Sequence, residues 1–459
     1  MWVFWCIPAL IPYVIDRLVI RIFYRGNKRM ALARVYFWGD PAKPDRPPNV
    51  ITLQFDNKVN DKGVKPLLYM EGHYLYLQCP AVDNTRGPLR EWHPFTISSA
   101  PDEQVLEVNI RVMPHKDSWT RKVADYLQLL DPPDPVTKKR KGMVELFTRN
   151  PQTGELTLGK VLGPDGRQFF RVDAPHGAPS QHVYRYRTCM LVGAGIGVTP
   201  CASIMKGVIG YRWKKGFSPS HLHFFWVARR SDLSTFKWLL ALLPQLKLEE
   251  KKHNEHYGGD EQQLQAMESR VKVLRNELGV GGPSSVGASG LPPGWQSAKT
   301  EDGHTYYWNS QTQERTWAVP TAGPPGALPG QDMRAKQDEL LQTQESLVAA
   351  SIGNRSLTIT LYLTGCKDAD IQPDPSAAPD SEAGLITKLL ESKVIIKAGR
   401  PRWDSEFTQI AETYNTMYGK EEVGVVFCGA PLIAAALKEQ CEEKSDVNGT
   451  LFRLHKENF

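Results

Sequence analysis

This sequence lacks three features that would assign a chain of 459 residues to a familiar class. Its 7 cysteines include no C-x-x-C pair, and several lie inside apolar, strand-like runs. This pattern indicates reduced thiols in a cytosolic compartment, and we expect no metal site. There is no D-x-D-x-D-G calcium loop to suggest an activating signal. No apolar run is long enough to cross a bilayer.

An excess of charge of one sign is also missing, because 56 basic residues stand against 50 acidic ones. The formal net charge of +6 is too balanced for a dedicated nucleic-acid-binding protein, so only local basic clusters need interpretation. A hydrophobic fraction of 41% is enough for packed cores. The chain is therefore a globular protein.

Residues 1–15 are almost wholly apolar, and a basic flank follows them. A signal peptide carries its charge on the opposite side. Fifteen helical residues reach roughly 22 Å, short of a hydrocarbon core of roughly 30 Å. We interpret residues 1–28 as the end of a transmembrane helix, with the positive flank placing the rest of the chain in the cytoplasm. A buried N-terminal helix is the alternative, which the lack of a polar face disfavours.

Hydrophobic patterning divides the remainder into two kinds of sheet. Short alternating runs in residues 29–184 predict an antiparallel β-barrel, with residues 131–168 as a long surface loop. Solid apolar runs followed by helices predict a parallel α/β sheet built from residues 185–247 and 355–459. The predicted strands lie at 35–38, 50–55, 74–78, 106–112, 189–192, 223–228, 357–363 and 423–427.

A glycine-rich turn, G-A-G-I-G-V-T-P, follows the first apolar run of the α/β part directly. Its glycines Gly193, Gly195 and Gly197 let backbone N–H groups approach a pyrophosphate, and Thr199 and Pro200 read as the N-cap and first turn of a helix. The acidic residue expected for an NAD ribose is absent. Arg229 and Arg230 end the next strand instead, which favours NADPH because a guanidinium can bind a 2′-phosphate.

A second motif, W-H-P-F-T-I-S-S-A-P, lies in the barrel half. It offers rings for a flavin, hydroxyl groups for its polar edge and a later arginine for a pyrophosphate. Taken alone it is a proline-broken strand. The residues concerned are His93, Pro94, Phe95, Thr96, Ser99 and Arg111.

Four ordered motifs together resemble the dehydrogenase region of the NADPH oxidase family: H-P-F-T-I-S-S-A-P, the glycine turn, F-C-G-A-P at 427–431 and the terminal K-E-N-F. The resemblance covers about residues 2–246 and 355–459. It implies a ferredoxin-NADP reductase-like fold, in which an antiparallel flavin barrel precedes a parallel-sheet nucleotide-binding domain. It also implies FAD and NADPH as cofactors, with haem only in a missing membrane part, since the first histidine of this chain is His73.

The resemblance further assigns individual residues. His93, Pro94, Phe95, Thr96, Ser99 and Arg111 match the FAD motif, with Trp119 near its phosphates. Gly193, Gly195, Gly197, Thr199, Pro200, Arg229, Arg230 and Arg400 match NADPH positions. Cys428 is expected beside the nicotinamide, and Phe459 is expected to cover the flavin ring, although terminal residues usually fray. Residues 173–177, D-A-P-H-G, depart from the family's D-G-P-F-G.

Residues 248–354 interrupt the nucleotide-binding domain. Residues 248–290 read as a charged helix and linker, and residues 321–354 as a linker and a helix; an apolar seam from Leu264 to Leu278 is expected to pack on its own protein. Between them, residues 291–320 resemble a WW domain, with tryptophans at 295 and 317 and a terminal proline. That likeness implies a groove for a proline-rich peptide formed by Tyr306, Trp308 and Trp317.

These observations predict hydride transfer from NADPH to FAD and then electron transfer toward membrane haem and oxygen, which would make superoxide. Two alternatives stay open: a ferric-chelate reductase, and a WW-based adaptor with a degenerate reductase half. The expected partners are a proline-rich peptide, the membrane and, as an open possibility, a second copy of the chain. Nucleic acid is not expected.

Overall fold

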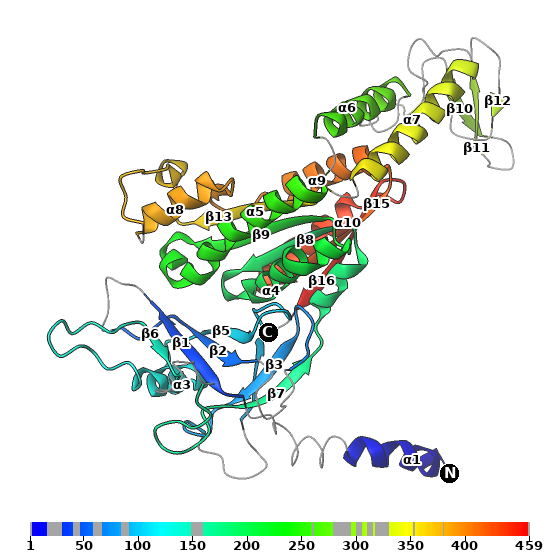
Figure 1. The fold of residues 1–459 in the computed structure, drawn as a ribbon. Coiled ribbons are helices and arrows are strands. Elements are labelled where there is room, and N and C mark those ends of the chain that lie inside the picture. The colour runs from blue at the N-terminus through cyan, green and yellow to red at the C-terminus, as the bar shows by residue number, and fades with distance from the viewer. Residues whose placement is uncertain are drawn as a thin grey trace. The chain divides into compact units, whose positions relative to one another are not determined.

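A computed structural model describes residues 2–15, 30–39, 46–57, 67–83, 91–147, 159–258, 261–278, 295–299, 305–309, 315–316, 330–351, 354–379 and 381–457. The chain forms two compact units (Figure 1). The first comprises Met1–Tyr257, Asn354–Ala411 and Lys420–Phe459, and the second comprises Gly258–Gly353 and Glu412–Gly419.

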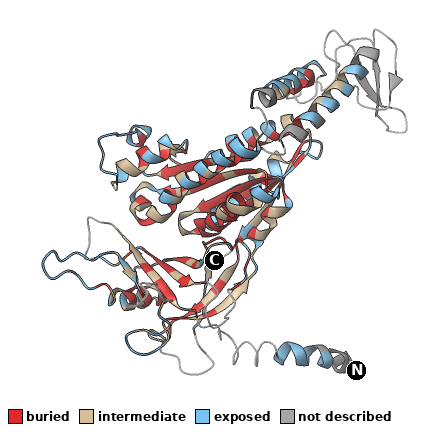
Figure 2. Ribbon diagram, viewed as in Figure 1, coloured by how far each residue is buried: buried red, intermediate tan, exposed pale blue. Residues whose placement is uncertain are grey.

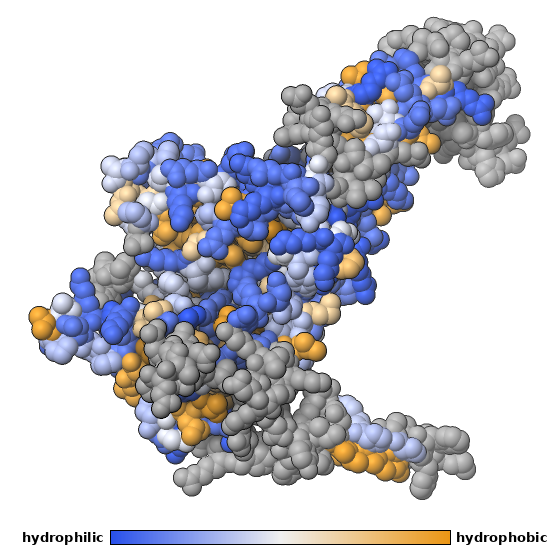
Figure 3. Space-filling view, in the orientation of Figure 1, coloured by the Kyte–Doolittle hydropathy of each residue, from blue (hydrophilic) through white to orange (hydrophobic). Residues whose placement is uncertain are grey.

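Helix α1 (Trp2–Val14) begins the first unit and contains Pro8 and Pro12. Its apolar side chains include the exposed Leu10 and Ile11, and Figure 3 shows part of this apolar surface. Among the described residues, no helix combines the length and the apolar character needed to cross a membrane.

Two antiparallel sheets form the barrel half, as predicted. A four-stranded sheet has the order β5-β2-β1-β6, and a three-stranded sheet has the order β4-β3-β7. Their bounds are β1 Leu32–Trp38, β2 Val50–Asp56, β3 Tyr74–Gln78, β4 His93–Thr96, β5 Val105–Arg111, β6 Met143–Glu145 and β7 Arg171–His176. A bridge between Ile97 and Val108 joins the sheets, and buried residues of both, drawn red in Figure 2, form one core.

Helix α3 (Trp119–Gln128) closes one end of this barrel core. Ser118 caps it, because the side chain of Ser118 accepts a hydrogen bond from the backbone N–H of Arg121. Val123 and Leu127, four residues apart on one face, are fully buried among the sheet side chains. The amphipathic face thereby holds Trp119, the first residue of α3, in the barrel core.

Six parallel strands form the central sheet of the other half, in the order β14-β13-β9-β8-β15-β16. They are β8 Thr188–Ala194, β9 His221–Arg229, β13 Ser356–Thr364, β14 Ile395–Ala398, β15 Glu421–Cys428 and β16 Thr450–Glu457. The four strands predicted from solid apolar runs are confirmed. Strands β14 and β16, which lie at the two edges of the sheet, were not predicted from the sequence.

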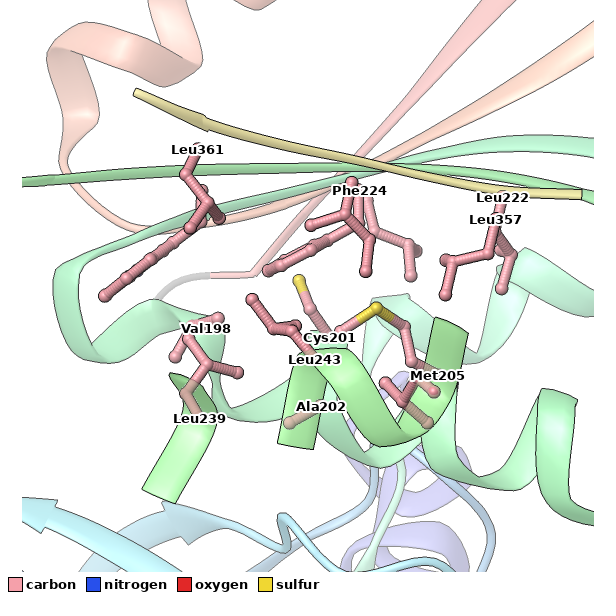
Figure 4. Packing of buried hydrophobic residues seen from close by; sticks show 14 of the residues in the cluster. Val198, Cys201, Ala202, Met205, Leu222, Phe224, Leu239, Leu243, Leu357 and Leu361 are labelled. Atoms are coloured by element: carbon pink, nitrogen blue, oxygen red, sulfur yellow. The ribbon is translucent and has the colours of Figure 1, made fainter. Parts of the chain in front are cut away.

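Helices cover both faces of this sheet. They are α4 Thr199–Gly207, α5 Lys237–Tyr257, α8 Glu382–Glu391, α9 Trp403–Tyr418 and α10 Pro431–Lys444. On one face, residues of α4 and α5 such as Met205 and Leu243 pack against Phe224 of β9 (Figure 4). On the other face, the neighbouring Phe225 meets Trp403 of α9 edge to face at 5.8 Å. The alternation of side chains along β9 therefore builds two cores.

Helix α5 runs through the boundary expected at residue 247 and belongs to the first unit as far as Tyr257. Glu250 and His253 are buried in this extension. The backbone N–H of Leu357 donates a 2.7 Å hydrogen bond to Glu250, which attaches the helix to the start of β13. The charged sequence after residue 247 is thus the continuation of a nucleotide-domain helix as far as Tyr257, with one buried face.

The second unit holds helices α6 (Glu261–Glu277) and α7 (Gly330–Ser351) and an antiparallel sheet. The strands of that sheet are β10 Trp295–Lys299, β11 Thr305–Asn309 and β12 Arg315–Thr316. Val271 of the predicted apolar seam packs against Leu347 of α7, and Met417 lies beside them. The expectation that this short seam packs on its own protein is confirmed.

Candidate functional site

The order of the parallel strands reverses between β8 and β15. From β8 the chain adds β9, β13 and β14 on one side, and then returns to add β15 and β16 on the other. Cys428, the last residue of β15, is in register with Gly193 near the end of β8. Ligands of open α/β sheets bind outside the carboxyl ends of the strands at such a switch point. The glycine turn and Cys428 therefore meet where a nucleotide site is expected.

Close backbone packing explains two of the glycines in the turn. A Cβ at Gly197 would stand 2.7 Å from the carbonyl carbon of Cys428 and closer still to its oxygen. A Cβ at Gly193 would stand 2.9 Å from the Cα of Val198. Gly195 has a positive φ of 54°, which side chains disfavour. All three glycines are therefore required by the fold of the turn.

The prediction that Thr199 is the N-cap of the following helix is wrong. Thr199 is the first helical residue of α4, Val198 occupies the cap position, and no side chain caps it. A 3-10 turn, η3 (Gly195–Val198), leads into α4 and replaces the expected cap. Pro200 lies in the first turn, as predicted. The helix N-terminus consequently keeps its first amides free of side-chain capping, as an anion site requires.

Arg111 brings a positive charge from the barrel to this turn. It ends β5 and is exposed, and its Nη1 lies 3.9 Å from the position that a Cβ on Gly195 would take. The two residues are 84 positions apart in the sequence (195 − 111). The structure thus places the predicted pyrophosphate arginine beside the predicted phosphate turn.

Three stacked rings lie on the barrel part of the chain, two from the flavin motif and one from α3. The ring of His93 stacks on Trp119 at 4.3 Å between centroids, and Phe95 stacks on the same indole at 5.8 Å. Nε2 of His93 lies 2.9 Å from a carboxylate oxygen of Glu91. Pro94, between the two rings, is exposed. Trp119, expected near phosphates, therefore acts as the support of the two rings assigned to the flavin.

Hydroxyl groups of the same motif are engaged inside the protein. Ser99 is fully buried, and its Oγ lies 2.8 Å from the hydroxyl of Tyr69 and accepts from the backbone N–H of Glu107. Its carbonyl accepts a hydrogen bond from Ser203 of α4. Thr96 is also buried. Ser99 thus joins the barrel to the nucleotide domain, and its contact with a flavin stays a prediction.

The three arginines assigned to NADPH have different surroundings. Arg230 is paired with Glu382 at 2.5 Å and with Asp370 at 3.6 Å, and its hydrogen bond to Glu382 raises its pKa. Arg229, at the end of β9, is exposed, and no other described residue binds its guanidinium. Arg400 is also exposed and follows Gly399 at the end of β14. Arg229 and Arg400 are therefore available to a phosphate, whereas Arg230 is neutralised.

Cys428 and Glu457 end adjacent strands and are in register with each other. Burial raises the pKa of the Cys428 thiol to about 12, so the thiol is neutral at physiological pH. Burial also raises the pKa of Glu457, to about 7. The backbone N–H of Ser180 donates to Oε1 of Glu457 at 3.1 Å, whereas Oε2 has no hydrogen-bond partner in the described part of the chain. The sequence analysis missed Glu457, although its place at the end of an alternating run was visible.

Some predicted site residues fall outside this description. Phe459 and Trp317 lie outside the described residues. For Tyr306 and Trp308 the structure gives the backbone, which pairs with Ala298 and with Gln296 in the antiparallel sheet of β10 and β11.

Family comparisons agree with the division into parts. Residues 46–156 match the family model of an FAD-binding domain, and residues 186–278 match that of a ferric reductase NAD-binding domain. Residues 291–320 match the WW domain. The first match falls on the barrel, the second includes the glycine turn, and the third covers the inserted sheet.

Curated relatives are NADPH oxidases. One superoxide-generating NADPH oxidase heavy chain of Dictyostelium discoideum is 31% identical over 249 residues, which cover 53% of this chain and 39% of the relative. NADPH oxidase 1 of Mus musculus is 24% identical over 460 residues, covering 99% of this chain and 50% of the relative. The chain thus spans half or less of the length of these relatives.

Among solved structures, a ferredoxin NADP+ reductase from Neisseria gonorrhoeae is 12% identical, with a TM-score of 0.27 over 48% of this chain and 65% of that protein. The antiparallel barrel, the parallel sheet with its glycine turn, the family matches and the named relatives lead to one assignment. The chain matches an FAD-binding domain, a ferric reductase NAD-binding domain and a WW domain, and it is similar to the dehydrogenase region of NADPH oxidases, with the WW domain inserted into that region.

Proposed function

We propose that this chain binds FAD on the barrel and NADPH on the parallel sheet and transfers hydride from one to the other. The observation that carries this proposal is that the glycine turn at the switch point of the sheet meets Arg111 at Gly195 and Cys428 at Gly197. A cation, a cradle of glycine backbone and an uncapped helix start are the groups that bind a dinucleotide pyrophosphate.

The residues present fit both cofactors. For FAD, the His93 and Phe95 rings stack on the indole of Trp119, and Arg111 supplies a positive charge at the end of β5. For NADPH, the turn at Gly195 leads to a helix start without a side-chain cap, and Arg229 is exposed at the end of β9. An exposed guanidinium at that place suits a 2′-phosphate better than a bare ribose.

When bound, FAD and NADPH would supply the hydride chemistry, in which a hydride would move from C4 of the dihydronicotinamide to N5 of the flavin. The protein contributes alignment and electrostatics. The neutral thiol of Cys428 provides an uncharged wall at the end of β15. The free Oε2 of Glu457 offers an acceptor to a carboxamide N–H close to it. By the family resemblance, Phe459, which lies outside the described residues, would cover the flavin ring.

Later steps of the proposal rest on the relatives. Two of them are named as superoxide-generating NADPH oxidase heavy chains. We propose that electrons leave this region for haem in a membrane part of the protein and then reduce oxygen to superoxide, with this region on the cytoplasmic side. The inserted WW domain would bind a proline-rich peptide through Tyr306, Trp308 and Trp317.

A ferric-chelate reductase is the second candidate function, because the family model that covers residues 186–278 is that of a ferric reductase NAD-binding domain. It shares the hydride step and differs in the final acceptor. The proposed hydride step is tested by purifying the chain with FAD and measuring NADPH-dependent reduction of an artificial dye. Arg111→Ala should lower flavin content, whereas Arg167→Ala, an exposed arginine elsewhere on the barrel, should not. A protein that retains flavin but shows no NADPH-dependent reduction would contradict the proposal.

A further inference from the structure

A buried ion pair joins the barrel to the nucleotide domain. Glu71, on the turn before β3, is completely buried, and the guanidinium of Arg212 binds it through two parallel contacts of 3.1 Å, from Nε to Oε1 and from Nη2 to Oε2. Tyr211 donates a further hydrogen bond to Oε1, and the ring of Tyr184 lies under the guanidinium at 3.6 Å. Arg212 and Tyr211 of the nucleotide domain therefore bind one carboxylate of the barrel, and Tyr184 supports the guanidinium.

Helix α4 has a glycine at the position where it lies against Glu71. Gly207 ends α4, and a Cβ there would stand 2.8 Å from Cδ of Glu71 and 2.5 Å from its Cγ. Any larger residue at 207 would push the carboxylate out of the fork of Arg212. Glycine at the end of α4 and glutamate at 71 are thus matched to each other.

The next residue, Gly72, connects the two predicted cofactor sites. Its N–H donates to Oγ of Ser203, at 3.4 Å, and Ser203 donates to the carbonyl of Ser99 in the flavin motif. Its carbonyl accepts from Oγ of Ser180, whose backbone N–H binds Glu457 beside Cys428. Gly72 has a φ of 78°, and a Cβ there would collide with Ser180. The turn at Gly72 is therefore linked by hydrogen bonds through Ser203 to the flavin motif, and through Ser180 to the nicotinamide end of the sheet.

We infer that Glu71 and Arg212 are positioning residues: their bidentate pair holds the turn at Gly72 so that the flavin motif and the Cys428–Glu457 strand ends stay aligned for hydride transfer. This inference rests on the proposed function. A buried ion pair adds little to stability compared with apolar residues of the same size, but its two parallel hydrogen bonds define a geometry. Hydride transfer depends on such geometry, because a displacement of about 1 Å can lower a rate on the order of a hundredfold.

The test compares the parent with Glu71→Met/Arg212→Met, which removes both charges, and with Arg212→Lys, which keeps the charge and removes the fork. For each protein, the melting temperature, the affinity for FAD, the Kd for NADPH and the rate constant of flavin reduction at saturating NADPH are measured. Glu422→Gln, which breaks the exposed pair with Arg453 at the opposite end of β15, is the control.

We expect the double variant to melt close to the parent and to bind both cofactors, yet to reduce flavin at least about tenfold more slowly. Arg212→Lys should also slow reduction without a matching change in the Kd for NADPH, and the control should not change it. A double variant, or an Arg212→Lys protein, that keeps the parental rate overturns the positioning role alone. A parent that binds both cofactors and reduces no flavin overturns the proposed function, and this inference with it.

Discussion

Gly197 lies against the main chain of Cys428, so close that a Cβ on Gly197 would stand 2.7 Å from the carbonyl carbon of that cysteine. This contact holds the glycine turn after β8 against the end of β15, at the candidate nucleotide site. Because the neighbour is backbone, which cannot rotate away, the contact leaves no room for adjustment.

Gly197→Ala is therefore expected to displace the turn. Overpacking of this kind costs about 1–3 kcal/mol of unfolding free energy, and the displaced amides should weaken NADPH binding at least about tenfold. The measurement is NADPH affinity by titration together with the melting temperature. Gly39→Ala is the control, because a Cβ there makes an ordinary 3.5 Å contact with Pro48. Parental affinity in Gly197→Ala would show that the turn does not hold the nucleotide.

Cofactor preference tests the difference between the two neighbouring arginines. Arg229 is exposed, whereas Arg230 is paired with Glu382 and Asp370. We expect Arg229→Ala to lower the ratio of kcat/KM for NADPH over NADH by roughly tenfold or more, since a charge-assisted contact with the 2′-phosphate is lost. Arg230→Ala should change that ratio much less. Equal rates with both nucleotides in the unchanged protein would refute the assignment.

The buried carboxyl of Glu457 predicts a specific pH dependence of stability. Its pKa rises from an ordinary value of 4.5 to about 7 in the folded protein, chiefly through burial. Between these values the unfolded chain releases the proton while the folded chain keeps it, so the contribution of Glu457 to stability falls as pH rises and then levels off above 7. The difference in unfolding free energy between Glu457→Gln and the parent should therefore shift in favour of Glu457→Gln by on the order of 3 kcal/mol from acidic to alkaline pH.

Urea unfolding of the two proteins at several pH values measures this gain. Glu422→Gln serves as the control, because Glu422 lies half exposed at the start of the adjacent strand. A stability difference between the parent and Glu457→Gln that does not change with pH would show that Glu457 is not held in its buried environment.

Deletion of residues 282–330 tests the independence of the insert. Those residues are enclosed between α6 and α7, whose own contact through Val271 and Leu347 remains after the deletion. With a short glycine-serine linker in their place, flavin content and NADPH-dependent dye reduction should stay within about twofold of the parent, because segments rich in glycine and proline typically uncouple neighbouring domains energetically. The deletion is compared with Val271→Asp, which places a charge in the contact between α6 and α7. Loss of both properties on deletion would show that the insert supports the nucleotide sheet.

The sequence was sufficient for the elements with strong local signals. Solid apolar runs predicted β8, β9, β13 and β15, because strands buried on both faces have no polar side. The edge strand β16 was missed, since T-L-F-R-L-H-K-E alternates like a strand of an antiparallel sheet. The sequence also placed the glycine turn correctly but not its cap, because η3 inserts a turn that spacing does not reveal.

The features that the sequence could not show are contacts between distant residues. Glu71 and Arg212 are 141 positions apart, and neither belongs to a motif. The neutralisation of Arg230 depends on Glu382, which is 152 positions away in the sequence. Such pairs require the tertiary fold, because local patterning carries no information about them.

Anaerobic flavin reduction tests the central claim most directly. The purified chain is loaded with FAD and mixed rapidly with NADPH, or with NADPH deuterated at C4, while the flavin absorbance is followed. If hydride passes directly from nicotinamide to flavin, the absorbance should bleach in a single fast phase, and deuteration should slow that phase several-fold. Flavin that stays bound and oxidised in the presence of saturating NADPH would contradict the account.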